Sequence, residues 1–370
     1  NIRENILDMD LAVIDAWLKG RDDAMVLFDF AAAFPSLGHE YLFKALLAIG
    51  IPPRMVRAYK WLYFKNSHRM RWKGQVYSSV NVLSGVRQGC PLSPLLFVLA
   101  LEPLLWKLKT SLPKATFRAF ADDIGSVIPE ISLNWDRVIS IFTAFESFSC
   151  LAINIDKVIV VPLWKLGVRK EELGWFIRSA WHQAKLTSKG KYLGIVLGPG
   201  ARPSDSYASG LEKMDKRALM WKLPYFSMLH KIEVWNVYML TLFSYVDQVF
   251  IQPEEVTSKA MSLMKSFLGG CNGWTHAVGY GFLSDWFGFP KDARLPHVVN
   301  WAALARCWHS LPSASRARYT IGVRRLNDIT TIANLPFSPL MHLMHAQNSF
   351  SGKWGLDPAE ELRMLTAAKF

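Results

Sequence analysis

The chain has 370 residues, enough for two or three subdomains that each bury a core. Hydrophobic residues make up 51% of it and charged residues 20%, which predicts a globular rather than a disordered protein. The formal net charge of +13 favours a polyanionic partner, although a generic basic protein would carry the same charge.

Apolar residues at helical spacing predict a first helix over residues 6–18, which Gly20 ends. Residues 24–30 (AMVLFDF) form a nearly continuous apolar run, which is typical of a strand covered on both faces. Two helices and a hairpin that turns at Lys73–Gly74 are predicted next, over residues 39–49, 53–64 and 69–82.

Pro91 and Pro94 mark the start of a long apolar helix that runs past Trp106. Residues 118–128 predict a strand, a tight turn and a strand. A helix and two strands follow, over residues 135–148, 152–161 and 192–197. Beyond about residue 200 the pattern is helical. A mixed core followed by an all-α region predicts an α+β protein with separate subdomains.

The four cysteines are far apart in the sequence: Cys90, Cys150, Cys271 and Cys307. They form no CxxC pair and no Cys/His spacing typical of a zinc site, so we expect a reduced, intracellular compartment and no zinc. The most apolar run, residues 92–105, is too short to span a bilayer, so we expect no membrane partner. Because the chain begins with Asn1 rather than Met, we expect a fragment whose upstream part is missing.

Aspartates at the ends of predicted strands are the candidate catalytic residues. Asp29 is the only charged residue in an apolar strand, where a carboxylate is costly unless a cation compensates it. Asp122 and Asp123 lie between two apolar strand halves, and adjacent side chains converge only at a turn. Neighbouring carboxylates repel, so a functional pair at neutral pH needs a divalent cation. Three such acids could hold two Mg²⁺ ions about 3.5–4 Å apart, as in in-line phosphoryl displacement.

The alternative for Asp122 and Asp123 is a pair of solvated acids at a turn. From the local sequence alone, the two interpretations are equally open. A second acidic pair, Asp22 and Asp23, stands beside Arg21 in a polar setting, and we predict that this second pair is structural.

Five segments occur in order along the chain: FDFAAAFPSL (28–37), SGVRQGCPLSPLLF (84–97), AFADDI (119–124), SCLAINIDK (149–157) and KYLGIVLG (191–198). Together they resemble five successive motifs of non-LTR retrotransposon (LINE-type) reverse transcriptases. The second segment is the most specific of the five. The resemblance is strong over residues 6–198 and extends to the helical remainder only by topology.

The resemblance implies an RNA-directed DNA polymerase in which Asp29, Asp122 and Asp123 are the catalytic, metal-binding residues. The backbone carbonyl of Phe30 would be a further metal ligand. Two Mg²⁺ ions, or Mn²⁺ in their place, would activate the primer 3′-hydroxyl and stabilise the departing pyrophosphate. Lys157 matches the lysine that is proposed to protonate pyrophosphate, although a lone lysine is commonly just solvated.

Other positions match the substrate-binding parts of the family. Phe34 matches the bulky side chain that packs under the sugar and excludes a 2′-hydroxyl, although a plain core position is the commoner fate of a phenylalanine. Gln88 and Gly89 match the loop that approaches the incoming nucleotide and the template. A YLG turn, which could equally be core sheet, matches the primer grip: Tyr192, Leu193 and Gly194.

Seven cations in a stretch without any acid predict contact with the template: Arg54, Arg57, Lys60, Lys65, Arg69, Arg71 and Lys73. Aromatic residues are interleaved with them, Trp61 and Trp72 among them, and for these side chains we expect the core rather than the groove. A weaker basic cluster follows in the presumed thumb: Lys213, Lys216, Arg217 and Lys222.

The expected fold is a right-hand polymerase of the α+β class, with an antiparallel palm sheet packed on helices, partial fingers and an all-α thumb. We predict partial fingers over residues 1–83, together with the first palm strand and the first motif at 20–37. The palm would follow over residues 84–200, the thumb over 201–300 and a C-terminal helical extension over 301–370. The family's upstream fingers motifs would precede Asn1. Two positions depart from the family: Cys150 stands where Gly is common, and Phe120, which should still pack, replaces the commoner Tyr.

The expected partners are an RNA template, a DNA primer and deoxynucleoside triphosphates (dNTPs), and the family favours the nucleus over the cytoplasm. The alternative is a truncated, catalytically silent remnant that still binds nucleic acid. A group II intron maturase is less favoured, because its intron-binding additions are not recognisable. The sequence leaves the oligomeric state open.

Overall fold

The computed structural model describes residues 2–64, 67–221, 226–269, 277–327, 338–344 and 346. The chain divides into two compact units. The sheet unit consists of Asp15–Leu193 together with Ile2, and the helical unit contains Arg3–Ile14 and the described residues from Gly194 onward. The predicted first helix is α1 (Ile2–Lys19), which contributes residues to both units.

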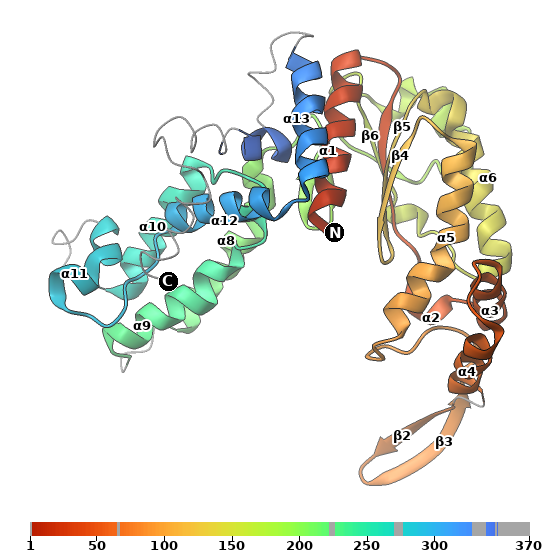
Figure 1. The fold of residues 1–370 in the computed structure, drawn as a ribbon, viewed down its shortest axis with the longest axis horizontal. Helices are drawn as coiled ribbons and strands as arrows, with labels where there is room; N and C mark the ends of the chain where they lie inside the picture. Colours follow the sequence, from red (N-terminus) through yellow and green to blue (C-terminus); the bar gives the residue numbers. More distant parts are fainter. Residues whose placement is uncertain are drawn as a thin grey trace. The chain divides into compact units, whose positions relative to one another are not determined.

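The sheet unit is built on five strands: β1 (Ala24–Phe28), β4 (Thr116–Phe120), β5 (Asp123–Ile128), β6 (Ile159–Pro162) and β7 (Lys185–Leu186). Their order is β4–β5–β1–β6–β7, antiparallel except for the parallel pair β6–β7 (Figure 1). Strand β1 is central, and all five of its residues are buried, as its apolar run predicts.

The long helices α5 (Ser93–Ser111) and α6 (Ile131–Ser149) cover one face of this sheet. Ala24, Val26 and Phe28 alternate along β1 and share one continuous core with both helices. The ring of Phe28 lies 4.6 Å from that of Phe142 in α6, between centroids. The smaller elements of the unit are α2 (Ala33–Ser36), η1 (Ile155–Lys157), η2 (Lys170–Glu172), α7 (Gly174–Ile177) and β8 (Gly190–Tyr192).

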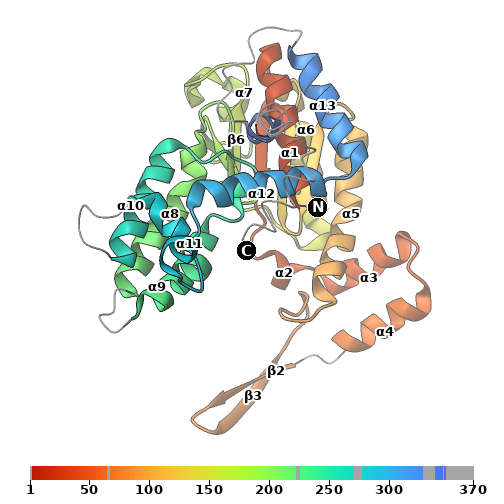
Figure 2. The ribbon, with the colours of Figure 1, turned by 60° about the vertical axis from the view of Figure 1, so that its left-hand side comes forward.

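Two further helices of the sheet unit, α3 (His39–Ala48) and α4 (Pro53–Tyr63), precede a hairpin of β2 (Ser67–Trp72) and β3 (Gln75–Asn81). Lys73 and Gly74 turn the hairpin with φ of 47° and 83°, the two left-handed residues that a type I′ turn requires. The predicted helices and turn are therefore confirmed. Figures 1 and 2 both show the hairpin projecting beyond α4, away from the sheet of its own unit.

Among its described residues, the helical unit is all-α apart from the short strand β9 (Ile195–Leu197), as predicted. Its α-helices are α8 (Pro203–Met220), α9 (Met228–Val234), α10 (Glu254–Leu268), α11 (Leu283–Phe287), α12 (Pro296–Ser310) and α13 (Ser313–Asn327). A π-helix and three 3-10 helices lie between them: η3 (Trp235–Met239), η4 (Leu240–Leu242), η5 (Val246–Gln248) and η6 (Ala277–Phe282).

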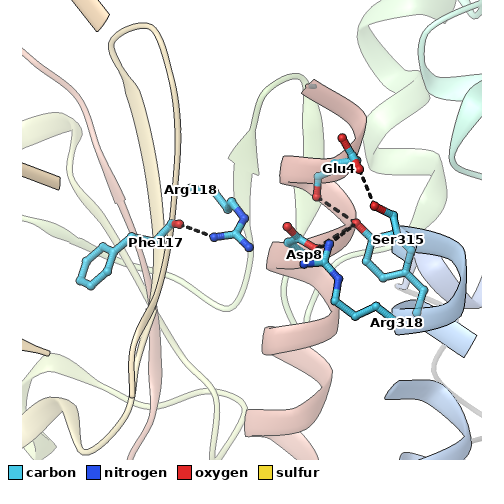
Figure 3. Close-up of polar contacts among 7 residues, drawn as sticks. Glu4, Asp8, Phe117, Arg118, Ser315 and Arg318 are labelled. Atoms are coloured by element: carbon cyan, nitrogen blue, oxygen red, sulfur yellow. Dashed lines mark hydrogen bonds and ion pairs between the residues drawn. The ribbon is translucent and has the colours of Figure 1, made fainter. Parts of the chain in front are cut away.

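The first helix and the late helix α13 are joined by polar contacts within the helical unit (Figure 3). Glu4 accepts a hydrogen bond from the hydroxyl of Ser315 at 2.6 Å, and Asp8 pairs with Arg318 at 2.5 Å. Asp10 is buried and accepts a hydrogen bond from the hydroxyl of Ser338 at 2.6 Å. Three acids of α1 therefore bind segments more than 300 residues away in sequence.

The α+β class is confirmed, whereas two predicted strands are shorter than expected. Over residues 152–161 only β6 is a strand, because Ile155–Lys157 form a 3-10 turn. The strand predicted over residues 192–197 is interrupted at Leu193 and Gly194, whose φ values are 47° and 85°. Among the described residues, no helix is long and apolar enough to cross a membrane. The division into fingers, palm, thumb and extension stays a prediction.

Candidate functional site

Three aspartates lie at one end of two neighbouring strands. The β1–β5 register pairs Phe28 with Ile124, so continuing it by one residue places Asp29 opposite Asp123. Strands β4 and β5 form a hairpin that pairs Phe120 with Asp123, which leaves Asp122 in the turn. The antiparallel order of the strands thus brings Asp29 to the pair at 122–123, nearly a hundred residues later in the sequence.

The proximity of the three aspartates affects the pKa of Asp123. Its pKa is raised, first by partial burial and then by the negative charges of Asp122 and Asp29. A carboxyl group whose neighbours are carboxylates favours its protonated form unless a cation offsets the repulsion. The three aspartates therefore form one electrostatic group at this edge of the sheet.

Asp29 carries an unsatisfied oxygen. Its Oδ2 atom is buried and accepts no hydrogen bond from the described residues, although the Nζ atom of Lys157 lies 3.1 Å away as an ion pair. The contact meets the distance for an ion pair but not the geometry of a hydrogen bond. Because the lysine side chain is 61% exposed, water screens the pair. An exposed ammonium therefore compensates the Asp29 carboxylate only weakly.

The backbone around Asp29 is fixed by the segment that ends at Lys157. The carbonyl of Asp29 accepts a hydrogen bond from the amide of Asn154, and the amide of Ala31 donates to the carbonyl of Ala152, both at 2.8 Å. These two bonds flank the bridge between Phe30 and Ile153. In an antiparallel pair flanked by hydrogen bonds in this way, the two bridged residues, Phe30 and Ile153, direct their own backbone N–H and C=O groups away from each other. The bridge therefore does not use the Phe30 carbonyl.

The donor set suits a hard divalent cation, because carboxylate and backbone carbonyl oxygens are hard ligands of the kind that Mg²⁺ takes. The Oδ2 atom of Asp29 accepts no hydrogen bond from the described residues, and its one ion pair is with an exposed lysine. Burial and the charges of Asp122 and Asp29 raise the pKa of Asp123, so the negative charge of this group is only partly compensated. Across the described part of the chain, no three His, Cys, Asp or Glu side chains already converge as a ready metal cluster. The residues fit the ion chemically, and the carboxylates would have to draw closer to share it.

The second motif is anchored to the first by a tight backbone contact. Gly85 lies so close to Pro35 that an added Cβ atom would be 2.5 Å from the Pro35 carbonyl oxygen, and its φ is +86°. Its amide donates to the carbonyl of Leu37 at 2.7 Å, and its carbonyl contacts Nε2 of His39 at 2.7 Å. Only glycine fits both the close approach and the backbone conformation. Sequence reasoning singled out Gly89 and missed Gly85.

The loop after Gly85 presents the predicted nucleotide-binding residues to solvent. Gln88 and Gly89 are exposed, and Gly89 has a φ of +84° with open space where a Cβ would lie. Phe34 is half-buried and stacks on Phe97 of α5, with ring centroids 4.7 Å apart and an interplanar angle of 14°. Phe34 therefore has one face fixed by the core and an edge that is partly open.

The predicted primer grip contains a buried side chain. Tyr192 is 2% exposed, and its hydroxyl donates to the carbonyl of Arg118 on β4 at 3.0 Å. A Cβ atom on Gly125 of β5 would lie 2.8 Å from the Tyr192 ring. The side chain thus supports the hairpin that carries Asp122, and a primer contact from this turn would have to come from Leu193 and Gly194.

The predicted template cations are exposed on α4 and on the hairpin, while Lys65 lies outside the described residues. The expectation that the aromatic residues among them face the core is wrong for Trp61, Phe64 and Trp72, which are 73%, 59% and 65% exposed. Tyr63 is buried. In the helical unit, Lys216 pairs with Glu212, and Arg217 donates to the carbonyl of Tyr238. Lys222 lies outside the described residues.

The second acidic pair has the structural role that was predicted for it. Asp22 accepts hydrogen bonds from the amide and hydroxyl of Ser132, and Asp23 accepts one from the amide of Glu130 at 3.1 Å. These contacts cap the start of α6 from a distant part of the chain. Unlike the strand-end aspartates, this pair is satisfied by donors of the protein itself.

Both departures from the family have structural consequences. Cys150 ends α6 with φ 63° and ψ 16°, a left-handed conformation that favours glycine. Phe120, which was expected to pack, is instead 47% exposed beside the turn at Asp122. It exposes an aromatic ring at the mouth of the site.

The chain is similar in sequence to a known protein family and to several curated proteins. The family model described as reverse transcriptase (RNA-dependent DNA polymerase) matches residues 3–197. The chain is 26% identical over 231 residues to the Pol polyprotein of the type-2 retrotransposable element R2DM of Drosophila melanogaster, covering 58% of this chain and 22% of the relative. It is 27% identical over 209 residues to the transposon TX1 149 kDa protein of Xenopus laevis, covering 54% and 16%.

A third relative is the Pol polyprotein of the type-1 element R2 of Popillia japonica, which is 30% identical over 115 residues and is covered to 19%. The chain thus spans about a fifth of the length of the curated relatives it matches. Among solved structures, it is similar to telomerase from Candida tropicalis in complex with a fragment of telomeric RNA. That similarity has a TM-score of 0.44 at 10% identity, covering all of this chain and 53% of the other.

Proposed function

Because the chain belongs to the reverse transcriptase (RNA-dependent DNA polymerase) family, we propose that it extends a DNA primer on an RNA template as part of a non-LTR retrotransposon protein. The single observation that carries the proposal is the position of Asp29, Asp122 and Asp123 at one sheet edge, where partial burial and then the charges of Asp122 and Asp29 raise the pKa of Asp123. Neighbouring carboxylates with one exposed lysine as their protein counter-ion suit a site that takes its cations with the substrate.

In this proposal Asp29, Asp122 and Asp123 hold two divalent cations, with the carbonyl of Phe30 as a further oxygen donor. Bound ions of this kind would lower the pKa of the primer 3′-hydroxyl and neutralise charge on the triphosphate. The protein contributes mainly position and electrostatic stabilisation, since phosphoryl transfer needs little covalent chemistry from side chains.

The other predicted residues act on the substrates. Phe34, fixed by its stack on Phe97, would contact the sugar and disfavour a 2′-hydroxyl. Gln88 and Gly89 would line the path of the incoming nucleotide. Lys157 pairs with Asp29 at 3.1 Å, and its side chain is 61% exposed, so its ammonium would be accessible to the pyrophosphate. The exposed cations of α4 and the hairpin would contact template phosphates.

The second candidate is a catalytically silent remnant that binds nucleic acid. It is favoured by the finding that, among the described residues, no three His, Cys, Asp or Glu side chains already lie close enough to hold a metal ion. Such a remnant would keep the basic surface and the fold while failing to incorporate nucleotides.

Incorporation of dTTP on poly(rA)/oligo(dT) with Mg²⁺ separates the two candidates. The polymerase proposal expects template-dependent extension that Asp122→Ala reduces by about 10²–10³-fold or more, the size of effect seen when one group that stabilises the transition state is lost. Asp136→Asn, which changes an exposed acid on α6, is the matched control and should extend normally. Binding without extension by both the unmodified chain and Asp122→Ala would favour the remnant.

A further inference from the structure

The β2–β3 hairpin exposes an apolar face. Met70 pairs with Tyr77 and Trp72 pairs with Gln75, so these side chains share one face of the two-stranded sheet. Met70, Trp72 and Tyr77 are 72%, 65% and 47% exposed. A bare apolar strand face on a projecting hairpin is costly for a protein that works alone, so it indicates a partner.

The charge around this face identifies the class of partner. No Asp or Glu occurs between Glu40 and Glu102 in the sequence. Within the described part of the chain, no carboxylate pairs with the hairpin cations Arg69, Arg71 and Lys73. Cations that no carboxylate neutralises attract a polyanion, and flat exposed rings suit a ligand with flat apolar surfaces.

The tip of the hairpin brings both kinds of group together. Trp72 ends β2 and Lys73 begins the turn, so the indole and an ammonium are adjacent in sequence at the most distal part of the hairpin. Nucleic acid offers both phosphates and base faces, but a duplex hides its base faces in the stack. Only an unpaired strand exposes them to an aromatic ring.

We propose that the β2–β3 hairpin binds the single-stranded part of the template, with Trp72 stacking on an unpaired base and Lys73 neutralising an adjacent phosphate. Met70 and Tyr77 flank this stack and cover the neighbouring nucleotide. The assignment rests on the proposed polymerase function for the identity of the strand as template, and on the hairpin alone for its preference for unpaired nucleotides. The hairpin would thus contact a base through an aromatic ring, which its basic residues alone would not do.

Fluorescence anisotropy with the 370-residue chain and two labelled RNAs tests the proposal: an unstructured 20-mer and a blunt duplex of the same length. Trp72→Ala should weaken binding of the single strand by about tenfold, the effect of losing one base–aromatic stack, and change duplex binding less than about twofold. Trp72→Phe should restore most of the affinity. Lys73→Gln should lower the slope of log Kd against log salt by about 0.7 for the single strand.

Trp106→Ala is the matched control, because Trp106 is 67% exposed on α5 and should leave both affinities unchanged. The proposal is overturned if Trp72→Ala binds the single strand as tightly as the unmodified chain. It is also overturned if that substitution dissociates a dimer in sedimentation while RNA affinity stays constant, since a second copy would then cover the face. Failure of the polymerase function would be recognised separately, as an absence of Asp122-dependent extension.

Discussion

The ring of Tyr192 lies across Gly125, in the space that a Cβ atom at position 125 would enter, 2.8 Å from the nearest ring atom. The same tyrosine donates its hydroxyl to the carbonyl of Arg118 at 3.0 Å. Gly125 and Arg118 belong to the two strands of the hairpin that turns at Ala121 and Asp122. Tyr192 therefore supports the hairpin that carries Asp122 and Asp123.

Gly125→Ala should force the hairpin and Tyr192 apart, and we expect it to lower the free energy of unfolding by about 1–3 kcal/mol, the usual cost of overpacking. Extension should fall as well, because the carboxylates would be displaced. Urea denaturation and primer extension measure the two effects. The double variant Gly125→Ala/Tyr192→Ala is the control: if the clash is the cause, adding the alanine at position 125 should cost little once the ring is gone. Fully additive effects would contradict this explanation.

Phe34→Ala should relax the choice between deoxynucleotides and ribonucleotides. The ring is held by its stack on Phe97, so its removal would open space where we propose that the sugar lies. We expect the ratio of kcat/KM for dTTP over UTP to fall by about 10–100-fold, in the range set by one steric contact. Phe34→Tyr keeps the ring and should keep the ratio. If the ratio were unchanged in Phe34→Ala, Phe34 would be a core residue with no role in selecting the sugar.

Cys150→Gly should stabilise the protein. Cys150 ends α6 with φ 63°, a conformation that costs a residue with a Cβ about 1 kcal/mol and costs glycine almost nothing. Glycine is also freer in the unfolded chain, which offsets part of this relief of strain. We therefore expect a net increase of about 0.5 kcal/mol in the free energy of unfolding. Cys150→Ala retains the Cβ and should show no gain. Equal stability of the glycine and alanine variants would remove the strain argument.

Much of the site could be predicted from the sequence, because its motifs carry both the residue types and their order. The convergence of Asp29 with Asp123 follows from an apolar strand and a hairpin, which periodicity reveals. The contact of Gly85 with Pro35 could not be predicted in this way, since it joins a loop to a four-residue helix that is too short to show a periodic pattern. The exposure of Trp72 was missed because composition cannot distinguish a hairpin that projects from one that is covered.

The stability of the helical unit should depend on pH through Asp247. Tyr207 donates to its Oδ1 atom at 2.9 Å and Asn300 at 3.1 Å, while its Oδ2 atom is buried without a partner among the described residues. Burial raises the pKa of Asp247 to about 7. Between about pH 4 and 7 the folded protein therefore keeps a proton that the unfolded chain has lost, so stability falls as the pH rises.

Asp247→Asn removes this proton difference. We expect the loss of unfolding free energy between pH 5 and pH 7 to shrink, by at most about 1.4 kcal/mol per pH unit. Urea denaturation at several pH values measures the slope. Part of the slope should remain, because burial also raises the pKa of Asp10 to about 7. Asp215→Asn, at an ion pair with Lys259, is the control and should keep the full slope. An unchanged slope in Asp247→Asn would contradict the assignment.

The central claim is that Asp29, Asp122 and Asp123 share divalent cations, and Mn²⁺ titration followed by electron paramagnetic resonance tests it most directly. The protein would carry an RNA template, a primer with a dideoxy end and the matching dNTP, so that ions bind without turnover. We expect Asn at any of the three positions to weaken Mn²⁺ binding by at least about 10–100-fold, because the loss of a mere outer-shell partner already costs that much. The control variant Asp136→Asn should bind Mn²⁺ as the unmodified chain does. Mn²⁺ binding by Asp29→Asn at the affinity of the unmodified chain would contradict the claim.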